Sequence, residues 1–352
     1  MFVSLLMIGC DVSLSENDKH YFTVSFYDAN LDLEGQTKVD VRNPTIDIAQ
    51  LKTDLGLSAT KLYRASSSDD VINQISYSLT GDTNFYAIPN VVEITDQAGL
   101  ADINATAATL GGKYMLLKDI ALDDTKEGFD ANGWKPIGDN SNAFTGIFNG
   151  NGHKITGLWI NRPSMYYVGL FGFTNGAMIK NIGVEINGKE VKGDEFVGGI
   201  VGGANYGTIT NSYSTGNISG TSEVGGIVGG ATYGDITNSY ATGDISGTDD
   251  YIGGIVGFTT GDITNSYTTG DISGTDENVG GIVGYAAGDV TNSYATGDVS
   301  GSESVGGIVG YAAGDVTNNA AINQTVSAST SGVNKIVGGS SGTTSNNFAL
   351  DE

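Results

Sequence analysis

The amino-acid sequence predicts an all-β fold, a three-sided parallel β-helix or solenoid with coils of about 27 residues. Three repeated segments predict it. The first, Val-Gly-Gly-Ile-Val-Gly, stands at 197–202 and returns, with substitutions, in steps of 26 to 28 residues. The second, Asp-Ile-Thr-Asn-Ser-Tyr and its variants, keeps the same period, as does the third, Asp-Ile-Ser-Gly or Asp-Val-Ser-Gly.

Each repeat therefore holds three short β-branched runs separated by Gly, Asn, Asp and Thr, which are typical of turns. Three such strands cannot enclose a core alone, but stacked copies can pair with the coils above and below. A β-propeller blade would need four longer strands, and a leucine-rich repeat would show regular Leu and Asn spacing. The sequence favours the three-sided parallel β-helix over both.

Stacking places equivalent residues of neighbouring coils about 4.8 Å apart. We therefore predict two apolar ladders inside the solenoid and an asparagine ladder at one corner, because asparagine tolerates left-handed backbone. The paired glycines are expected at tight bends or close backbone approaches. The first apolar ladder is Ile200, Ile227, Ile255, Ile282 and Ile308, the second is Ile236, Ile263, Val290 and Val316, and the asparagine ladder is Asn181, Asn211, Asn238, Asn265, Asn292 and Asn318.

The residues before the repeats predict other elements. Apolar residues recur at helical spacing over 95–110, so we expect a single helix there, capped by Thr95 or Asp96. A strand is expected over 113–122. A helix laid over the first coil would cover an otherwise open end of the sheets.

The predicted organisation has five parts. The sequence divides into a lipoprotein-like signal segment at 1–10, a polar linker at 11–19, a small β-rich domain at 20–92, a cap helix with the first strands at 93–132, and the solenoid at 133–350.

Cys10 is the single cysteine and follows the apolar run at 2–9. This run resembles the end of a bacterial lipoprotein signal peptide, which predicts lipidation of Cys10, although Met7 stands where leucine is usual and no Lys or Arg comes before it. The alternative is a buried N-terminal strand with a free cysteine. No second apolar stretch approaches the ~20 residues that a bilayer crossing requires, so the protein is expected at the cell surface or outer membrane through a lipid anchor alone, or secreted.

The charge of the chain limits its partners. Forty acidic residues against sixteen basic ones give a formal net charge of -24. Such a field repels nucleic acid and anionic lipid, and it favours cations and basic partners. Nucleic-acid binding is excluded on this ground.

The repeats resemble the GLUG motif. The residues that carry the resemblance are Gly133–Gly138, Phe144–Leu158, Val168–Gly172 and the five Gly-Gly-Ile-Val-Gly copies. The resemblance covers about residues 93–350 and implies a right-handed β-helix on bacterial cell-surface proteins, many of them adhesin-like. Residues 20–92 more weakly resemble the small β-grasp-like repeats of bacterial surface proteins. The family provides no catalytic position.

His20 and His153 are the two histidines, and no His-Glu-x-x-His or nucleotide-binding glycine motif is present. Pectin-cleaving β-helices use aspartates, so a polysaccharide-active lyase or hydrolase remains an alternative. Residues 197–334 contain thirteen acids and no Lys or Arg to accompany them. The preferred interpretation is therefore that the protein is not an enzyme.

The acids of the repeats form two periodic rows. These rows are Asp235, Asp262, Asp289 and Asp315, and Asp244, Asp271 and Asp298. Carboxylates ~4.8 Å apart repel by roughly 0.9 kcal/mol per pair in water, which is tolerable if each accepts a turn amide. The alternative is that Ca²⁺ bridges coils at the acidic turns, with Asp249, Asp250, Asp276 and Glu277 as the candidate ligands.

A tyrosine row is the predicted contact surface. If Asn238 and its equivalents turn the corner, Ser239 points inward and Tyr240 outward. The row consists of Tyr213, Tyr240, Tyr267 and Tyr294. It could contact sugar faces or a protein, or its rings could stack on one another and shield the sheet. A third hypothesis, ice or mineral binding, would use the row Thr210, Thr237, Thr264 and Thr291.

Together these features predict a lipid-anchored, adhesin-like or structural surface protein. We expect its partner to be a glycan, the host matrix or a neighbouring cell-surface protein, with Ca²⁺ as the one candidate cofactor. The segment Asn346–Leu350 ends the last coil with little dedicated cap, which favours end-to-end self-association.

Overall fold

The computed structural model describes residues 21–40, 45–47, 50, 53–56, 64–65, 76–78, 85–86 and 90–350. Cys10, His20, the predicted linker at 11–19 and much of the predicted domain at 20–92 lie outside the described residues. The chain divides into two compact units, Met1–Glu93 with Lys113–Met115, and Ile94–Gly112 with Leu116–Glu352.

The described part of the first unit is rich in β-strands. Strand β1 (Tyr21–Tyr27) pairs antiparallel with β2 (Leu33–Asp40) and parallel with β6 (Phe85–Tyr86), giving the order β2-β1-β6-β4, where β4 is Arg64–Ala65. Strands β3 (Thr45–Asp47) and β5 (Ser76–Ser78) form a separate antiparallel pair.

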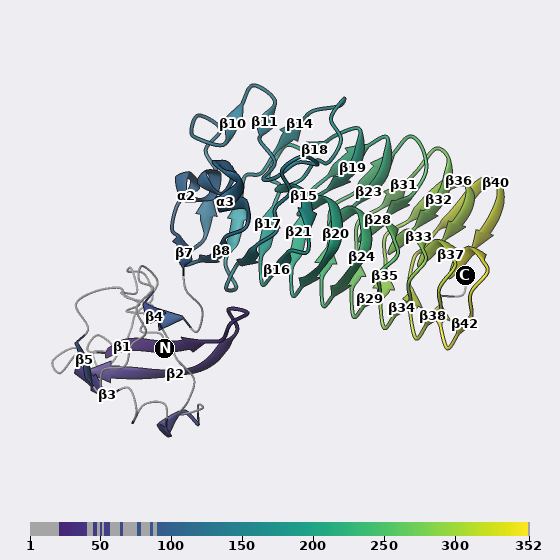
Figure 1. The fold of residues 1–352 in the computed structure, drawn as a ribbon. Coiled ribbons are helices and arrows are strands. Elements are labelled where there is room, and N and C mark those ends of the chain that lie inside the picture. The colour runs from purple at the N-terminus through teal and green to yellow at the C-terminus, as the bar shows by residue number, and fades with distance from the viewer. Residues whose placement is uncertain are drawn as a thin grey trace. The chain divides into compact units, whose positions relative to one another are not determined.

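The second unit is a parallel β-solenoid, as predicted, whose coils follow one another along its axis (Figure 1). Three sheets run along it. Sheet 1 contains β12 (Ile147–Asn149), β15 (Phe171–Asn175), β16 (Met178–Lys180), β20 (Val201–Thr210), β24 (Val228–Thr237), β28 (Val256–Thr259), β29 (Ile263–Thr264), β33 (Val283–Ala286), β34 (Val290–Thr291), β37 (Val309–Ala312), β38 (Val316–Thr317), β41 (Val337–Ser340) and β42 (Thr344–Ser345).

The other two sheets complete each coil. Sheet 2 contains β9 (Ile120–Ala121), β13 (Lys154–Thr156), β17 (Gly183–Glu185), β21 (Tyr213–Thr215), β25 (Tyr240–Ala241), β30 (Tyr267–Thr268), β35 (Tyr294–Ala295), β39 (Ala320–Ala321) and β43 (Phe348–Ala349). Sheet 3 contains β10 (Phe129–Asp130), β11 (Gly133–Trp134), β14 (Ile160–Asn161), β18 (Val191–Lys192), β19 (Glu195–Gly198), β22 (Ile218–Gly220), β23 (Ser222–Gly225), β26 (Ile245–Gly247), β27 (Ile252–Gly253), β31 (Ile272–Ser273), β32 (Glu277–Gly280), β36 (Val299–Gly306) and β40 (Val326–Asn334).

Both predicted apolar ladders are confirmed. Strand register aligns Ile236 with Ile263, Ile263 with Val290, and Val290 with Val316. The ladder that begins at Ile200 is fully buried in every coil, and each of its members donates its backbone N–H to the carbonyl of the equivalent residue one coil on. The core is therefore a set of continuous apolar rows, as a solenoid requires.

The core changes character toward the start of the solenoid. Trp134 is buried and its indole N–H donates to the carbonyl oxygen of Leu170 at 3.1 Å. The rings of Phe144 and Phe148 lie 4.9 and 5.3 Å from that of Phe171. These first coils are filled by aromatic rings where the later ones use Ile and Val.

The asparagine corner is also confirmed. The six predicted residues have φ between 51 and 59°, which is left-handed backbone. Side-chain amides link neighbouring coils, as where Asn265 Nδ2 donates to Asn238 Oδ1 at 3.1 Å. Ser239, the next residue, is buried, and its backbone N–H donates to Ser266 Oγ at 3.3 Å. The corner thus turns the chain between sheets 1 and 2 at the same point of each coil.

Close backbone approach explains the paired glycines. A Cβ on Gly199 would clash with Ser214 Oγ and would lie 2.7 Å from the carbonyl oxygen of Gly226 in the next coil. At Gly254 the added atom would clash with the carbonyl oxygen of Gly281. Any side chain at these positions would push successive coils apart.

The predicted single helix over 95–110 is wrong. The segment forms α2 (Gln97–Ala101), a 3-10 turn η2 (Asp102–Asn104) and α3 (Ala107–Leu110), between β7 (Val91–Ile94) and β8 (Lys113–Leu116). Asp96 caps α2, and Thr106 starts a second helix because its side chain and that of Thr109 form a reciprocal capping box. The predicted strand over 113–122 is likewise interrupted, into β8 and β9.

The helical segment is joined to the first coil by hydrogen bonds. Gln97 Nε2 donates to the carbonyl oxygens of Asp123 and Glu127, and Asn104 Nδ2 donates to that of Pro136 at 3.1 Å. In Figure 1 the two helices lie at the N-terminal end of the solenoid. The segment therefore caps the first coil, although not as one continuous helix.

Candidate functional site

The predicted tyrosine row exists and is stacked. The rings of Tyr213, Tyr240, Tyr267 and Tyr294 follow one another with centroids 4.9, 4.8 and 4.8 Å apart and nearly parallel planes. The buried serines beside them place the rings on the outer side of sheet 2, as the alternation predicted. Stacking is therefore part of what holds this sheet together.

Stacking also decides which ring faces a ligand can reach. The faces of Tyr240 and Tyr267 are covered by their neighbours in the row. Tyr294 is the most exposed member at 37%, because Ala320 occupies the position beyond it. The row thus offers ring edges and hydroxyls along its length and one open face at its end.

At its other end the row is fixed by charge. Tyr213 Oη donates to Glu185 Oε1 at 3.2 Å, and Lys154 Nζ donates to the same carboxylate at 3.1 Å. Burial and the neighbouring Glu185 raise the pKa of Tyr213 to about 12. This hydroxyl therefore remains protonated at any physiological pH.

The aspartate rows are used by the backbone. Asp262 Oδ1 accepts the backbone N–H of Asp289 at 2.8 Å, and Asp271 Oδ1 accepts that of Asp298 at 2.8 Å. Equivalent bonds run the length of both rows, as far as Thr343 and Thr325. The interpretation of these acids as turn-stabilising groups is confirmed, and it explains how carboxylates one strand spacing apart are tolerated.

Three of the four candidate calcium ligands converge. Asp249, Asp250 and Asp276 each place an oxygen within 4.8 Å of the others, whereas Glu277 stands outside this group. Asp250 Oδ1 also accepts the backbone N–H of Glu277 at 3.1 Å. Burial, followed by the charges of Asp249 and Asp276, raises the pKa of Asp250 above its ordinary value. The structure therefore brings together three of the four predicted ligands, two of them exposed.

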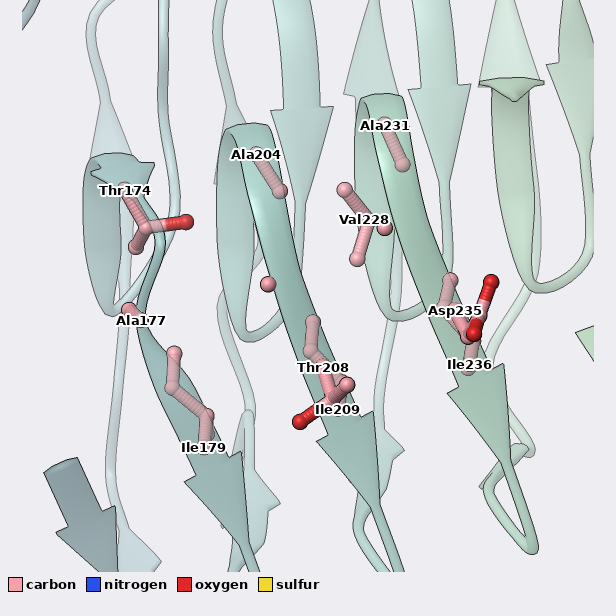
Figure 2. A pocket seen from close by; sticks show the side chains of 12 residues that line it. Thr174, Ala177, Ile179, Ala204, Thr208, Ile209, Val228, Ala231, Asp235 and Ile236 are labelled. Carbon is pink, nitrogen blue, oxygen red and sulfur yellow. The ribbon is translucent and has the colours of Figure 1, made fainter. Parts of the chain in front are cut away.

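A small cavity in sheet 1 can be set aside as a ligand site. It is lined by Thr174, Ala204 and Ala231 among others, on three successive strands (Figure 2). Its volume is about 10 Å³, which accommodates one water molecule at most.

An aromatic row that the sequence analysis missed runs along the outside of sheet 1. Strand register aligns Phe173, Gly203, Gly230, Phe258, Tyr285 and Tyr311. The last three rings stack with centroids 5.4 Å apart. The two glycines interrupt the row, so an open cavity of about 340 Å³ lies between Phe173 and Phe258.

Beside this row, six corner residues have left-handed backbone. They are Tyr167, Phe196, Glu223, Tyr251, Asn278 and Ser304, with φ between 50 and 65°. Bulky residues seldom adopt this conformation. The rings of Tyr167 and Phe196 lean over the two glycines, since a Cβ on Gly203 would lie 2.6 Å from the Tyr167 ring and one on Gly230 would lie 2.8 Å from Phe196.

Glu223 is the one acid among these corner residues, and it lines the cavity. Its Oε2 is buried without a hydrogen-bond partner. Burial, and secondarily the charge of Glu195, raises its pKa to about 7. A signal was present in the sequence: the residue before the Val-Gly or Ile-Gly that opens each of these six copies is aromatic in three, acidic in one and polar in two.

A second tyrosine pair was also missed. Tyr206 and Tyr233 stack at 5.2 Å and are 56 and 64% exposed, on strands β20 and β24.

Among the described residues, no helix is both long enough and apolar enough to cross a membrane.

Comparison with known proteins identifies the repeat. The GLUG motif matches residues 197–219, 220–246, 250–273 and 275–300. These four matches agree with the resemblance to the GLUG motif given by the sequence.

Two relatives share part of the chain. A protein of Evansella cellulosilytica, described as a candidate Gly-rich membrane protein, is 39% identical over 102 residues, which are 29% of this chain and 12% of the relative. Halomucin of Haloquadratum walsbyi is 35% identical over 133 residues, or 36% of this chain and 1% of that protein. The chain thus spans only a small part of the length of either relative.

A solved structure shares the fold. It is a candidate immunoglobulin A1 protease from Bacteroides ovatus, which superposes with a TM-score of 0.55 over 74% of this chain and 84% of that one. At 20% identity this likeness concerns the solenoid architecture.

Proposed function

We propose that the protein is a non-catalytic, adhesin-like surface protein whose rigid acidic solenoid presents repeated side-chain rows to a glycan. The observation that carries the proposal is the outward tyrosine row, which keeps one geometry over four coils and ends on the open face of Tyr294. Rigid aromatic rings with polar tips are suited to sugar faces and hydroxyls.

The arrangement of the acids supports a binding role over catalysis. Carboxylates of both aspartate rows accept backbone N–H groups, so they are committed to the turns. A catalytic carboxylate would need to be free to exchange a proton with a substrate. The names of the two partial relatives, a Gly-rich membrane protein and a halomucin, favour a place at the cell surface or outside the cell. A lipid on Cys10 would supply the anchor.

The test is binding of the purified chain to immobilised polysaccharides and mucin-type glycans. We expect Tyr294→Ala to lower binding at least about tenfold, and Tyr294→Phe to retain most of it because the ring face remains. Tyr233→Ala is the comparison on the other exposed tyrosine surface. Loss of binding in Tyr233→Ala with no change in Tyr294→Ala would overturn the assignment to the tyrosine row. Turnover of the polysaccharide by the wild-type chain would overturn the non-catalytic role.

A further inference from the structure

We propose that the open cavity beside Glu223 binds an alkylammonium group, either a small amine or the lysine side chain of a partner, with the Glu223 carboxylate as its counter-charge. The inference does not depend on the tyrosine row of sheet 2, since the cavity lies on the outside of sheet 1.

The cavity exists because the repeat is broken at two coils. In the regular coils Phe258, Tyr285 and Tyr311 fill this position with stacked rings. Gly203 and Gly230 carry no ring there, and the side chains of the corner residues lean over them instead. Three strand spacings separate Phe173 from Phe258, or roughly 14 Å, and about 340 Å³ is open between them. This space accommodates an extended chain of four or five methylene groups and its charged head.

The charge of the cavity selects a cation. No described residue donates a hydrogen bond to the Glu223 carboxylate or forms an ion pair with it, and the other charge that acts on it is the acid Glu195. Residues 197–334 contain no Lys or Arg. A half-buried carboxylate with only a like charge nearby gains most from a mobile cation. An anion would be repelled, and a neutral sugar would leave the charge uncompensated.

The walls favour an alkyl chain that carries this cation. The rings of Tyr167 and Phe196 stack at 4.7 Å, and Phe173 meets Tyr167 edge to face at 5.0 Å. The stacked faces of Tyr167 and Phe196 cover one another, so the side of Phe196 away from Tyr167 is the face left for a ligand. An aromatic face attracts a cation held within about 6 Å and packs against its methylene groups. Among the residues that line the cavity, Glu223 is the single carboxylate, and an inorganic Ca²⁺ would need about six to eight oxygen ligands.

The carboxylate also distinguishes ammonium from guanidinium. Glu223 Oε2 is buried against Gly230, since a Cβ on that glycine would clash with it. The two oxygens are therefore not presented together, as bidentate recognition of a guanidinium group requires. A compact ammonium group can approach one oxygen and still neutralise the carboxylate as a whole.

The experiment uses the full chain and n-pentylamine as the probe, observed by saturation-transfer NMR and isothermal titration calorimetry at pH 8. 1-Pentanol is the neutral probe of the same length, and n-pentylguanidine tests the head group. The variants are Glu223→Gln, which keeps the shape of the side chain, and Phe196→Leu, which removes one wall. Glu277→Gln is the matched control, because it removes one exposed acid from the same chain.

We expect pentylamine to bind wild type and Glu277→Gln equally, Glu223→Gln at least about tenfold more weakly, and Phe196→Leu more weakly by a smaller factor. Pentanol should not bind. Nα-acetyl-lysine amide, which keeps the charged side-chain ammonium, serves as a further probe to separate the two sources. If it binds more tightly than pentylamine, the natural ligand is a partner's lysine. If it binds more weakly, the natural ligand is a small amine. Equal binding of pentylamine to wild type and Glu223→Gln would overturn the proposal. So would an equal loss in Glu277→Gln, because it would show general attraction to an acidic surface.

Discussion

Two stretches of the solenoid share the same backbone repeat but differ in how their outward side chains contact one another. From Asp235 to Tyr294 the aspartate, asparagine and tyrosine rows repeat from coil to coil, and members of each row contact their counterparts in the next coil. From Tyr167 to Gly230 the backbone keeps the same register, yet the corner and sheet 1 positions change identity from coil to coil. Where side chains repeat, they satisfy one another, and where they do not, the surface keeps unpaired groups and open space.

We therefore expect the regular stretch to contribute mainly to folding stability and the irregular stretch mainly to ligand binding. A ladder in which each group has a partner leaves little for a ligand to bind, except at its ends. The Tyr294 face is such an end. The cavity beside Glu223 is a binding site of a different kind, within the row and not at its end. It forms because two glycines stand where other coils carry aromatic rings. Substitutions in the two stretches should therefore affect different properties.

The largest expected effect is on the regular core. Ile255 is fully buried in the first apolar ladder, with equivalent isoleucines above and below. Ile255→Ala should lower the free energy of unfolding by about 2–5 kcal/mol, because the coils cannot collapse onto the cavity. The measurement is the urea midpoint at pH 7. A loss below about 1 kcal/mol would show that the coils are less tightly packed than the structure indicates.

The second effect concerns the irregular stretch and depends on pH. The folded protein raises the pKa of Glu223 from 4.5 to about 7. A raised carboxyl pKa means that the folded state holds the proton more tightly, so this stability is present below pH 4.5 and is lost as the pH rises to about 7. Between these pH values the free energy of unfolding of wild type should fall by on the order of 2 kcal/mol relative to that of Glu223→Gln. This figure allows for the partial solvent exposure of the carboxyl group.

The measurement is the difference in urea midpoint between the two proteins at several pH values from 4 to 8. Taking the difference cancels the repulsion among the other acids, Glu195 included, which both proteins share. Parallel pH curves for the two proteins would contradict the assigned pKa.

A smaller effect is expected at the asparagine corner. Asn238→Ala places a residue without a side-chain amide in left-handed backbone and removes the bond from Asn265 Nδ2. The free energy of unfolding, measured by chemical denaturation, should fall by about 1–2 kcal/mol. Asn238→Gly should recover part of it, because glycine accepts φ of 51° without strain. If both variants lose equally, the amide bond rather than the backbone conformation is the source.

The smallest effect concerns the acidic turn. We expect millimolar Ca²⁺ to raise the melting temperature by a few degrees at most, because Asp249, Asp250 and Asp276 offer few ligands and solvent reaches them. The double variant Asp249→Asn, Asp276→Asn should lose the response. Equal stabilisation by Ca²⁺ and Mg²⁺ in wild type and variant would indicate screening of the net charge and not a site.

Much of the fold could be predicted because its determinants are local and repeated. The period of Ile200 and its equivalents, the corner at Asn238 and the outward position of Tyr240 all follow from the order of residues within one coil. The interruption of the predicted helix did not follow, because the capping box of Thr106 competes with a continuous helix and its outcome depends on packing against the first coil.

The candidate sites show the same limit. Sequence alone placed the tyrosines in a row, but their stacking decides which faces are open. It also indicated four acids as candidate calcium ligands, of which the structure brings three together. The Glu223 cavity was missed because it depends on residues from four coils, and no single repeat contains the pattern.

The sequence by itself determined the solenoid, its coil length and the identity of its ladders, because each coil is bound to its neighbours by equivalent residues and one repeat implies the next. Only the tertiary structure decided which of those residues satisfy one another and which face solvent. That outcome depends on the distances between stacked rings and on the volume of the cavity where Gly203 and Gly230 replace rings. Both are set only when the coils pack against one another.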